Sequence, residues 1–175
     1  MKSLYDSQEL DITITRLALQ LIENHEGFEN TVIIGLQPRG VHLSDRIFQK
    51  IQKILPKTRI EYGKLDITFY RDDFNEKGGL LQASDTQLDF PIEGKQIILV
   101  DDVLFTGRSI RAGLEALLDY GRPANVELLV LIDRRFNREV PIQPDYSGMA
   151  VDVIEDQKVK VLWQEKDGKD EVVLL

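Results

Sequence analysis

The fold of this 175-residue chain is decided by the stretch Ile97-Ile98-Leu99-Val100-Asp101-Asp102-Val103-Leu104-Phe105-Thr106-Gly107-Arg108-Ser109. Four apolar, β-forming residues run without a break into two carboxylates, and a turn that contains Gly then opens onto a helical pattern. Only a strand buried on both faces tolerates an unbroken apolar run, because both of its sides then contact protein. We therefore expect residues 97–100 to lie in the middle of a mostly parallel sheet in an α/β domain.

The residues after this strand favour a ligand that carries both hydroxyl groups and a phosphate. Open parallel sheets bind ligands at the carboxyl ends of their strands, where Asp101 and Asp102 are expected. The turn from Thr106 to Ser109 offers backbone N–H groups and hydroxyls at a helix start, and such a cup binds phosphate. A sugar phosphate fits both parts, since the acids can hold ribose hydroxyls or a Mg²⁺ ion.

A plainer interpretation of the same stretch is a buried strand followed by an acidic region before a helix that starts near Ser109. A serine at a helix start explains Ser109 well. This interpretation gives no reason for two adjacent carboxylates at the end of a buried strand, so we favour the ligand site.

Composition bounds the remaining possibilities. The chain is long enough for a substantial core, and we expect one domain that spans residues 1–175. It contains no cysteine, which excludes disulfides, thiolate chemistry and cysteine-ligated zinc. His25 precedes Gly27 at an expected helix end, where a charge–dipole contact is its expected role. The net charge of −8 argues against indiscriminate nucleic-acid binding but leaves room for a local basic patch.

The distribution of apolar side chains indicates the location of the protein and a candidate contact surface. No early apolar stretch has a basic leader and no apolar run approaches membrane-spanning length, so we expect a cytoplasmic protein without a membrane partner. Ile12 and Leu19 fall outside the apolar stripe of the first helix. They are either surface residues or part of an oligomer contact.

Strand and helix patterns alternate along the chain, as expected for a parallel α/β sheet. The first helix has an inward stripe that includes Leu10, Ile14 and Leu17. The expected elements are helices at about Ser7–His25, Val41–Leu55 and Ser109–Tyr120, and strands at Thr31–Leu36, within Arg59–Tyr70 (interrupted at Gly63), at Val126–Ile132, Lys158–Trp163 and Glu171–Leu175.

Residues 72–93 form an expected loop. The segment is polar, carries Gly78-Gly79 and offers little to fill a core. A loop this long inside a compact domain is usually mobile or functional, so we expect it to be flexible.

A second anion site is expected after the strand at Thr31–Leu36. The stretch Gly35-Leu36-Gln37-Pro38-Arg39-Gly40 places Gly40 at a helix entrance with Arg39 beside it, which offers N–H groups and a cation to an anion. An ordinary turn before a helix would look similar. Residues 101–109 favour the anion site, since the two strand ends can then grip opposite ends of one ligand.

The stretch at residues 97–109 closely resembles the phosphoribosyl-pyrophosphate (PRPP) binding motif of type I phosphoribosyltransferases. Further segments are similar to the family of bifunctional pyrimidine-operon attenuators and uracil phosphoribosyltransferases, and the likeness runs collinearly from about Leu10 to Val161. The segments are Gly63-Lys64-Leu65-Asp66-Ile67-Thr68-Phe69-Tyr70-Arg71-Asp72-Asp73, Thr106-Gly107-Arg108-Ser109-Ile110-Arg111-Ala112-Gly113, Gly121-Arg122-Pro123, Val130-Leu131-Ile132-Asp133-Arg134, Glu139-Val140-Pro141-Ile142, and Asp145-Tyr146 with Gly148.

The resemblance implies a type I phosphoribosyltransferase fold, with a flexible loop after Asp72 that closes over PRPP and a hood at about residues 133–161 that binds the base. It implies transfer of phosphoribose from PRPP to uracil, which gives UMP and pyrophosphate, with Mg²⁺ as the cofactor. It also implies a homodimer or a higher oligomer.

The resemblance assigns roles to individual residues. Asp101, Asp102 and Arg71 are the expected catalytic residues, and both acids are expected to contact the Mg²⁺ that PRPP carries. The ligand contacts that it implies are Pro38, Arg39 and Gly40 for pyrophosphate, Leu104, Phe105, Thr106, Gly107, Arg108 and Ser109 for the 5′-phosphate, and Ile132, Asp133 and Arg134 for the base.

The family also binds a pyrimidine messenger leader through a basic concave face. Thr15 and Arg16 match that face, and Arg138 matches it approximately, so these are the expected RNA contacts. Three positions depart from the family pattern. Leu19 stands where a polar or basic residue is expected, Gln143 replaces an expected Arg, and Met149 replaces an expected Lys. Phosphate contacts through cations supply most RNA affinity, so each such loss should weaken binding.

Other functions stay open at this stage. The cluster of Arg134, Arg135 and Arg138 is either a solvated loop beside the base pocket or part of an RNA face. The chain could be a phosphoribosyltransferase for another nucleobase, an RNA-binding attenuator with little catalysis, or a PRPP-binding regulator that does not catalyse.

Overall fold

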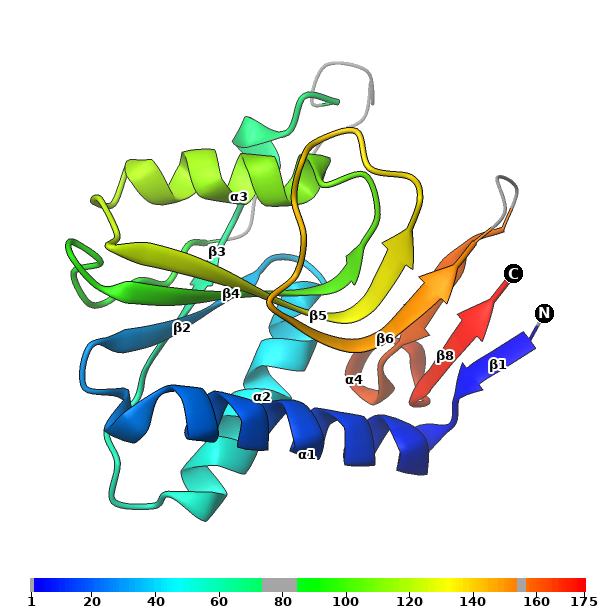
Figure 1. Cartoon of the computed structure of the whole chain (residues 1–175), viewed down its shortest axis with the longest axis horizontal. Coiled ribbons are helices and arrows are strands. Elements are labelled where there is room, and N and C mark those ends of the chain that lie inside the picture. The colour runs from blue at the N-terminus through cyan, green and yellow to red at the C-terminus, as the bar shows by residue number, and fades with distance from the viewer. Residues whose placement is uncertain (1, 74–84, 154–156) are drawn as a thin grey trace.

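The apolar stretch at residues 97–100 lies in the middle strand of a five-stranded sheet, which confirms the prediction from its sequence (Figure 1). The strand order is β3-β2-β4-β5-β6, and every neighbouring pair is parallel. The computed structural model describes residues 2–73, 85–153 and 157–175. The strands of this sheet are β2 (Thr31–Leu36), β3 (Glu61–Leu65), β4 (Gln96–Leu104), β5 (Asn125–Arg135) and β6 (Tyr146–Asp152).

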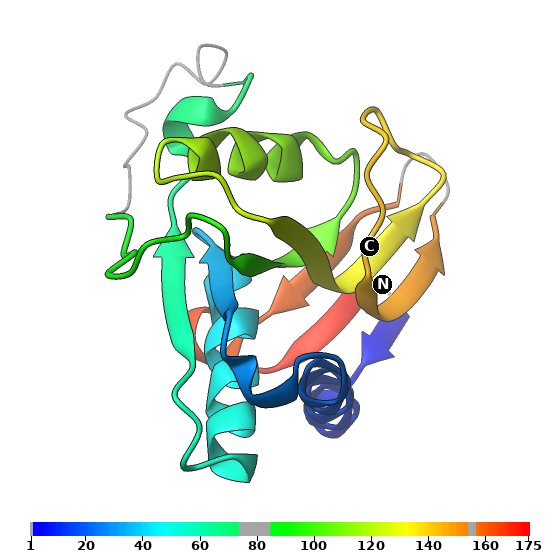
Figure 2. The same ribbon diagram turned by 60° about the vertical axis from the view of Figure 1, so that its left-hand side comes forward.

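Helices cover both faces of this sheet. Helices α1 (Ser7–Asn24) and α2 (Gly40–Ile54) lie on one face and α3 (Arg108–Leu118) lies on the other (Figure 2). Ile98 and Val100 pack into the core under α1 and α2, whereas Ile97 and Leu99 pack into the core under α3. All four side chains are at most 1% exposed, which is why this strand reads as an unbroken apolar run.

The order of the strands creates a point where neighbouring connections diverge. From β2 the chain crosses through α2 to β3 on one side, and from β4 it crosses through α3 to β5 on the other. The loops after β2 and β4 therefore leave the sheet side by side and move apart. Such a switch point is where open α/β sheets bind their ligands.

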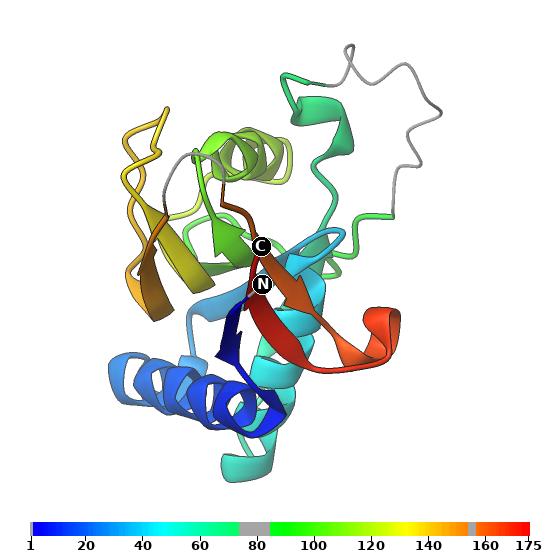
Figure 3. The same ribbon diagram turned by 90° about the vertical axis from the view of Figure 1, so that its right-hand side faces the viewer.

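A second, smaller sheet joins the two ends of the chain. Its strands, β1 (Lys2–Tyr5), β8 (Glu171–Leu174) and β7 (Val159–Leu162), are antiparallel in the order β1-β8-β7, and the short helix α4 (Gln164–Asp167) connects β7 to β8. The two termini consequently lie next to each other (Figure 3). The sequence predicted β7 and β8 and missed β1, whose four residues are exposed or only partly buried and show no apolar run.

The sequence also missed β6, since residues 133–157 were expected to be mainly loop. Strand β6 reads Tyr-Ser-Gly-Met-Ala-Val-Asp and lies at the edge of the sheet, so most of its side chains are only partly buried or exposed. An edge strand needs no continuous apolar stretch, and its sequence carries a correspondingly weak signal.

Strand β4 is longer than predicted. The sequence placed its end before Asp101, but the strand continues to Leu104 because β5 accompanies it up to the pair Leu104–Asp133. Pairing with β2, on the other side, stops at Val100. The two acids therefore lie on a strand that protrudes past one of its neighbours, and helix α3 begins at Arg108 rather than at Ser109.

The prediction that residues 72–93 contribute little to the core is wrong for residues 85–93. Ile92 is fully buried, and Leu88 and Phe90 pack against the core under α3. Gly63 does not interrupt β3 but allows this approach, since a Cβ there would lie 2.6 Å from the carbonyl oxygen of Gln87. The remaining part of the expected loop, residues 74–84, lies outside the described residues, as do residues 154–156 of the expected hood.

Two predictions about α1 concern its end and its exposed face. The helix ends at His25, as expected, and the ring contacts a side chain: its Nε2 atom lies 2.9 Å from Oε2 of Glu127. The charge–dipole role of His25 stays a prediction. Ile12 and Leu19 are 60% and 44% exposed and line a groove of about 510 Å³ along α1. None of the helices in the described part of the chain has the length and apolar character that a membrane crossing would need.

Candidate functional site

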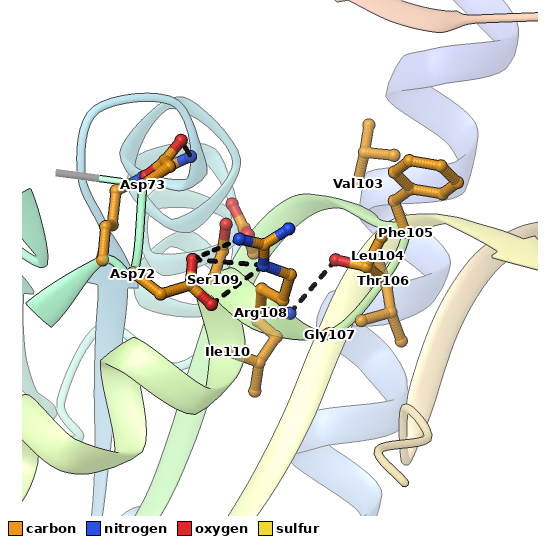
Figure 4. A pocket seen from close by; sticks show the side chains of 12 residues that line it. Asp72, Asp73, Val103, Leu104, Phe105, Thr106, Gly107, Arg108, Ser109 and Ile110 are labelled. Atoms are coloured by element: carbon orange, nitrogen blue, oxygen red, sulfur yellow. Dashed lines mark hydrogen bonds and ion pairs between the residues drawn. The ribbon is translucent and has the colours of Figure 1, made fainter. Parts of the chain in front are cut away.

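A cavity of about 280 Å³ opens where β4 ends and α3 begins (Figure 4). It lies at the switch point of the sheet, and residues within two parts of the chain, 71–73 and 101–110, form it. Its lining consists of Arg71, Asp72, Asp73, Asp101, Val103, Leu104, Phe105, Thr106, Gly107, Arg108, Ser109 and Ile110.

The turn at Thr106 to Ser109 has the geometry of an anion cup. Gly107 adopts a left-handed conformation with φ +89°, which a residue with a side chain rarely adopts, and α3 starts directly after it without a side-chain N-cap. The first N–H groups of such a helix have no intrahelical acceptor. The backbone N–H of Arg108 donates to Oγ1 of Thr106 at 3.3 Å, and Ser109 and Ile110 line the cavity. An anion is the natural partner for this helix start.

The loop between β5 and β6 holds the cup in place. The backbone N–H groups of Glu139 and Val140 donate to the carbonyl oxygen of Thr106 at 2.9 and 3.1 Å. Two other residues expected at the 5′-phosphate contribute differently: Leu104 is 1% exposed and belongs to the core, whereas the ring of Phe105 lies 3.8 Å from the Arg134 guanidinium. Neither side chain carries a polar group, so the backbone of these two residues supplies any hydrogen bond to a phosphate.

Arg108 is already paired with a carboxylate at the rim of the cavity. Its Nη2 and Nε atoms lie 2.8 and 2.9 Å from the two oxygens of Asp72, as Figure 4 shows, and its Nη1 lies 3.5 Å from Glu139. The pairing with Arg108 lowers the pKa of Asp72, yet both side chains are more than 40% exposed, so the pair contributes little to stability. A phosphate in the cup would compete with Asp72 for this cation.

The two acids of β4 have different surroundings. Asp101 lines the cavity, and Asp102 is absent from its lining, 7% exposed and 3.2 Å from Nε of Arg39. Burial and the neighbouring Asp102 charge raise the pKa of Asp101 well above its usual range. Burial also raises the pKa of Asp102, and the guanidinium of Arg39 opposes this increase.

The loop after β2 lies directly against these acids. A Cβ on Gly40 would lie 2.6 Å from the carbonyl oxygen of Val100 and 2.9 Å from Cα of Asp101, so only glycine permits this approach. Arg39 extends along β4 to Asp102 and also donates to the carbonyl oxygen of Val161. The exposed Pro38 precedes it. The predicted pyrophosphate loop and the predicted acids are thereby brought together.

Arg71 lines the cavity beside Asp72 and Asp73. Its guanidinium forms two hydrogen bonds to the Asp73 carboxylate, at 2.8 and 2.9 Å, and this contact raises the pKa of Arg71. Arg39 and Arg71 both lie near the acids, although only Arg71 lines the cavity.

The three residues expected at the base do not line this cavity. Ile132 is fully buried in the core under α1 and α2, and the Asp133 carboxylate forms an ion pair with Arg138. Arg134 is 7% exposed and donates from Nη2 to the carbonyl oxygen of Gln157 at 2.9 Å. The last residue pair between β4 and β5 is Leu104–Asp133, so β5 extends beyond β4 from Arg134 onward. The Arg134 guanidinium lies over the ring of Phe105.

The residues expected to contact RNA fall into two groups. Thr15 and Arg16 lie on the exposed face of α1, where Arg16 donates to the carbonyl oxygen of Gly148 at 2.7 Å. The guanidinium of Arg138, by contrast, is paired within the protein. It donates to the carbonyl oxygens of Phe105, Arg134 and Ile142 and forms an ion pair with Asp133. It braces the hood against the cup.

The donor set suits a hard divalent cation shared with a substrate. Within residues 2–73, 85–153 and 157–175, no three His, Asp or Glu side chains gather into a ready-made metal site. Asp101 and Asp102 offer two carboxylates at the strand end. Mg²⁺ typically binds one or two carboxylates together with water and substrate phosphates, so these residues fit it.

Sequence reasoning missed several partners in the site. Asp72, which pairs with Arg108, occurs in a segment that was recognised only as a family signature. The contacts of Arg39 with Val161 and Asp167 join residues more than 120 positions apart, and no local pattern signals them.

Comparison with known proteins agrees with this geometry. Residues 1–164 match the family described as phosphoribosyl transferase domain. The bifunctional protein PyrR of Desulfosudis oleivorans is 49% identical over 169 residues, covering 97% of this chain and 93% of that protein. The bifunctional protein PyrR of Ligilactobacillus salivarius is 42% identical over 176 residues, covering 99% and 97%. The hypoxanthine phosphoribosyltransferase of Trypanosoma cruzi shares the fold, with a TM-score of 0.74, 17% identity and coverage of 100% of this chain and 96% of that structure.

The close approach of Gly40 to β4 can be tested by substitution. We expect Gly40→Ala to lower the free energy of unfolding by about 3 kcal/mol, because the new methyl group meets backbone atoms that cannot move aside. Gly168→Ala is the control: it adds a methyl group at φ +75° with nothing within 4 Å, and should cost only about 1 kcal/mol. Urea denaturation measures both, and equal losses would contradict the tight packing at Gly40.

Proposed function

The chain belongs to the phosphoribosyl transferase domain family and, within it, to the bifunctional PyrR proteins, and from this premise we propose that it is a uracil phosphoribosyltransferase. The reaction joins N1 of uracil to C1′ of PRPP, breaks the bond between C1′ and the pyrophosphate oxygen, and releases the N1 proton. The products are UMP and pyrophosphate. The observation that carries the proposal is the convergence of the Arg39–Gly40 loop and the Thr106–Ser109 cup on the acids of β4.

Each end of PRPP has a matching anion site in this proposal. The cup at Thr106 to Ser109 holds the 5′-phosphate through backbone N–H groups at the start of α3. The pyrophosphate lies at the start of α2, where Gly40 opens the helix and Arg39 supplies a cation. Arg71 reaches the same group from the cavity, and the ribose lies between the two anion sites.

The acids act on the sugar. The bond to pyrophosphate breaks at an anomeric carbon, so positive charge develops on the ribose and negative charge on the leaving group. Fixed charges aimed at such developing charge lower the barrier. Asp101 and Asp102 contact the ribose hydroxyls, and Asp102 stabilises the cationic ribose. Arg39 and Arg71 stabilise the departing pyrophosphate.

Mg²⁺ is the cofactor in this proposal. Asp101 and Asp102 would hold it together with oxygens of PRPP, and the ion neutralises charge on the pyrophosphate when it is bound. Uracil lies against the hood near Ile132, Asp133 and Arg134, where the backbone beyond Asp133 can read its edge. Phosphoribosyltransferase activity on another nucleobase is the alternative within the same fold.

The activity can be tested with purified protein, PRPP, Mg²⁺ and a panel of bases. We expect UMP from uracil, and we expect Asp102→Asn to lower kcat at least about a hundredfold because it removes a fixed charge beside the developing cation. Asp11→Asn, an exposed carboxylate on α1, is the control and should keep wild-type turnover. Turnover of hypoxanthine instead of uracil would overturn the base assignment and leave the reaction class intact.

Binding of a pyrimidine messenger leader, switched by UMP, is a second candidate function. Two observations favour it. The relatives are named bifunctional proteins, and Arg16 is an exposed cation that the carbonyl oxygen of Gly148 holds in place. Arg138 supports it less, because its guanidinium is already paired within the hood. The predicted oligomer and the cytoplasmic location stay predictions.

The RNA function predicts a retarded complex with the leader transcript of the same organism when UMP is present. Arg16→Gln should weaken the complex and lower its salt slope by about one, because one phosphate contact is lost. Lys57→Gln, at an exposed turn after α2, is the matched control for loss of a single positive charge. Gel retardation at several stated salt concentrations measures this, and no complex with the wild-type protein would rule out the attenuator function.

A further inference from the structure

Trp163, the only tryptophan of the chain, lies immediately after β7 and is fully buried. Its ring centroid lies 6.0 Å from that of His42, and the Arg46 guanidinium lies over it at 4.9 Å. These contacts explain the packing of the ring. Both residues belong to α2, and neither accepts a hydrogen bond from the indole N–H group.

The indole Nε1 atom is buried and has no hydrogen-bond acceptor at bonding geometry among the described residues. A buried donor left unpaired costs about 1–3 kcal/mol. Proteins tolerate few such groups, so each one needs an explanation. An acceptor that becomes available in another state of the enzyme is one such explanation.

The nearby acceptor is the carboxylate of Asp102. The Trp163 side chain is near enough to this carboxylate to oppose, together with Arg39, the effect of burial on its pKa, although the indole N–H does not reach it at bonding geometry. The backbone around Trp163 is tied to the same carboxylate through Arg39. Arg39 donates to Asp102 and to the carbonyl oxygen of Val161, and Asp167 accepts from the backbone N–H of Trp163 at 2.9 Å while lying 3.5 Å from Arg39.

We propose that Trp163 is a positioning residue for Asp102, whose indole N–H takes over as donor when the pyrophosphate of the substrate draws Arg39 away. The exchange rests on the proposed function, because it requires Arg39 to bind the leaving group. Asp102 is buried and would lose its cation at that moment, and a buried carboxylate needs donors to keep its place. The unused N–H of Trp163 supplies one from a fixed position.

The same arrangement gives the small sheet a part in catalysis. Strand β7 and helix α4 supply Val161 and Asp167, which both contact the Arg39 guanidinium, and Trp163 lies between these two residues in the chain. Asp102 would thus be held by a segment that is remote in sequence and supplies no group that touches the substrate.

The indole N–H of Trp163 gives a single assignable signal in a ¹⁵N–¹H spectrum, which tests the proposal without turnover. We expect this signal to move downfield when PRPP binds the wild-type protein and to move much less when PRPP binds Asp102→Asn. An indole signal that stays in place when PRPP binds the wild-type protein, or that moves equally in Asp102→Asn, would overturn the proposal even if the protein makes UMP. If calorimetry detects no PRPP binding, the proposed function fails, and the donor exchange fails with it.

Kinetics separate positioning from packing. Trp163→Phe keeps an aromatic ring and removes the N–H, so kcat should fall roughly tenfold to a hundredfold, which is the effect of one hydrogen bond to a charged group. The KM for PRPP should change less than kcat does, because the fixed position of Asp102 matters most when positive charge develops on the ribose in the transition state. A wild-type kcat in a folded Trp163→Phe would overturn the proposal.

Arg46→Lys is the matched control, since it loosens the other face of the Trp163 ring and the contacts of Arg46 with Glu165 and Asp170 while it keeps the charge. It should lower the melting temperature and leave kcat unchanged. An equal loss of kcat in Arg46→Lys would make Trp163 a packing residue. If Trp163→Phe does not fold, the indole signal in Asp102→Asn decides the question.

Discussion

The contact between Arg39 and Asp102 holds the site together. Asp102 lies on a strand that is buried on both faces, and a carboxylate in such a place needs a cation or several hydrogen bonds. Arg39 supplies the cation from the end of the neighbouring strand, and it can do so only because Gly40 has no side chain where α2 meets β4. The requirement of one buried acid thus draws together the two loops that are proposed to hold the two ends of PRPP.

The sequence predicts the parts of the site that depend on local pattern. Residues 97–100 read as a strand buried on both faces because β4 packs against helices on both sides, and Gly107 marks the turn because only glycine readily adopts φ +89°. Contacts between distant segments leave no such mark. The partners of Arg39 in β7 and α4, the bracing of the hood by Arg138, and the edge strand β6 are therefore found only in the fold.

The cations around the site are already paired with carboxylates in this acidic protein. Arg39, Arg71, Arg108 and Arg138 each pair with a carboxylate around the site, so the cations that a ligand would need are held in place by acids that it can displace. Asp72 does this at the rim of the cavity and is exposed enough for the exchange to cost little. On the hood, Arg135 and Arg138 pair with Asp152 and Asp133. Arg16 on α1 donates to uncharged groups and is a clearer candidate for an RNA contact.

Calorimetry with the two halves of the ligand tests most directly whether two strand ends grip one phosphorylated sugar. In the presence of Mg²⁺, PRPP should bind at least roughly a hundredfold more tightly than ribose 5-phosphate or pyrophosphate alone, because joining the halves makes the second contact intramolecular. Each half should also displace PRPP. No heat of association with PRPP, or PRPP that binds no more tightly than one of its halves, would contradict the account.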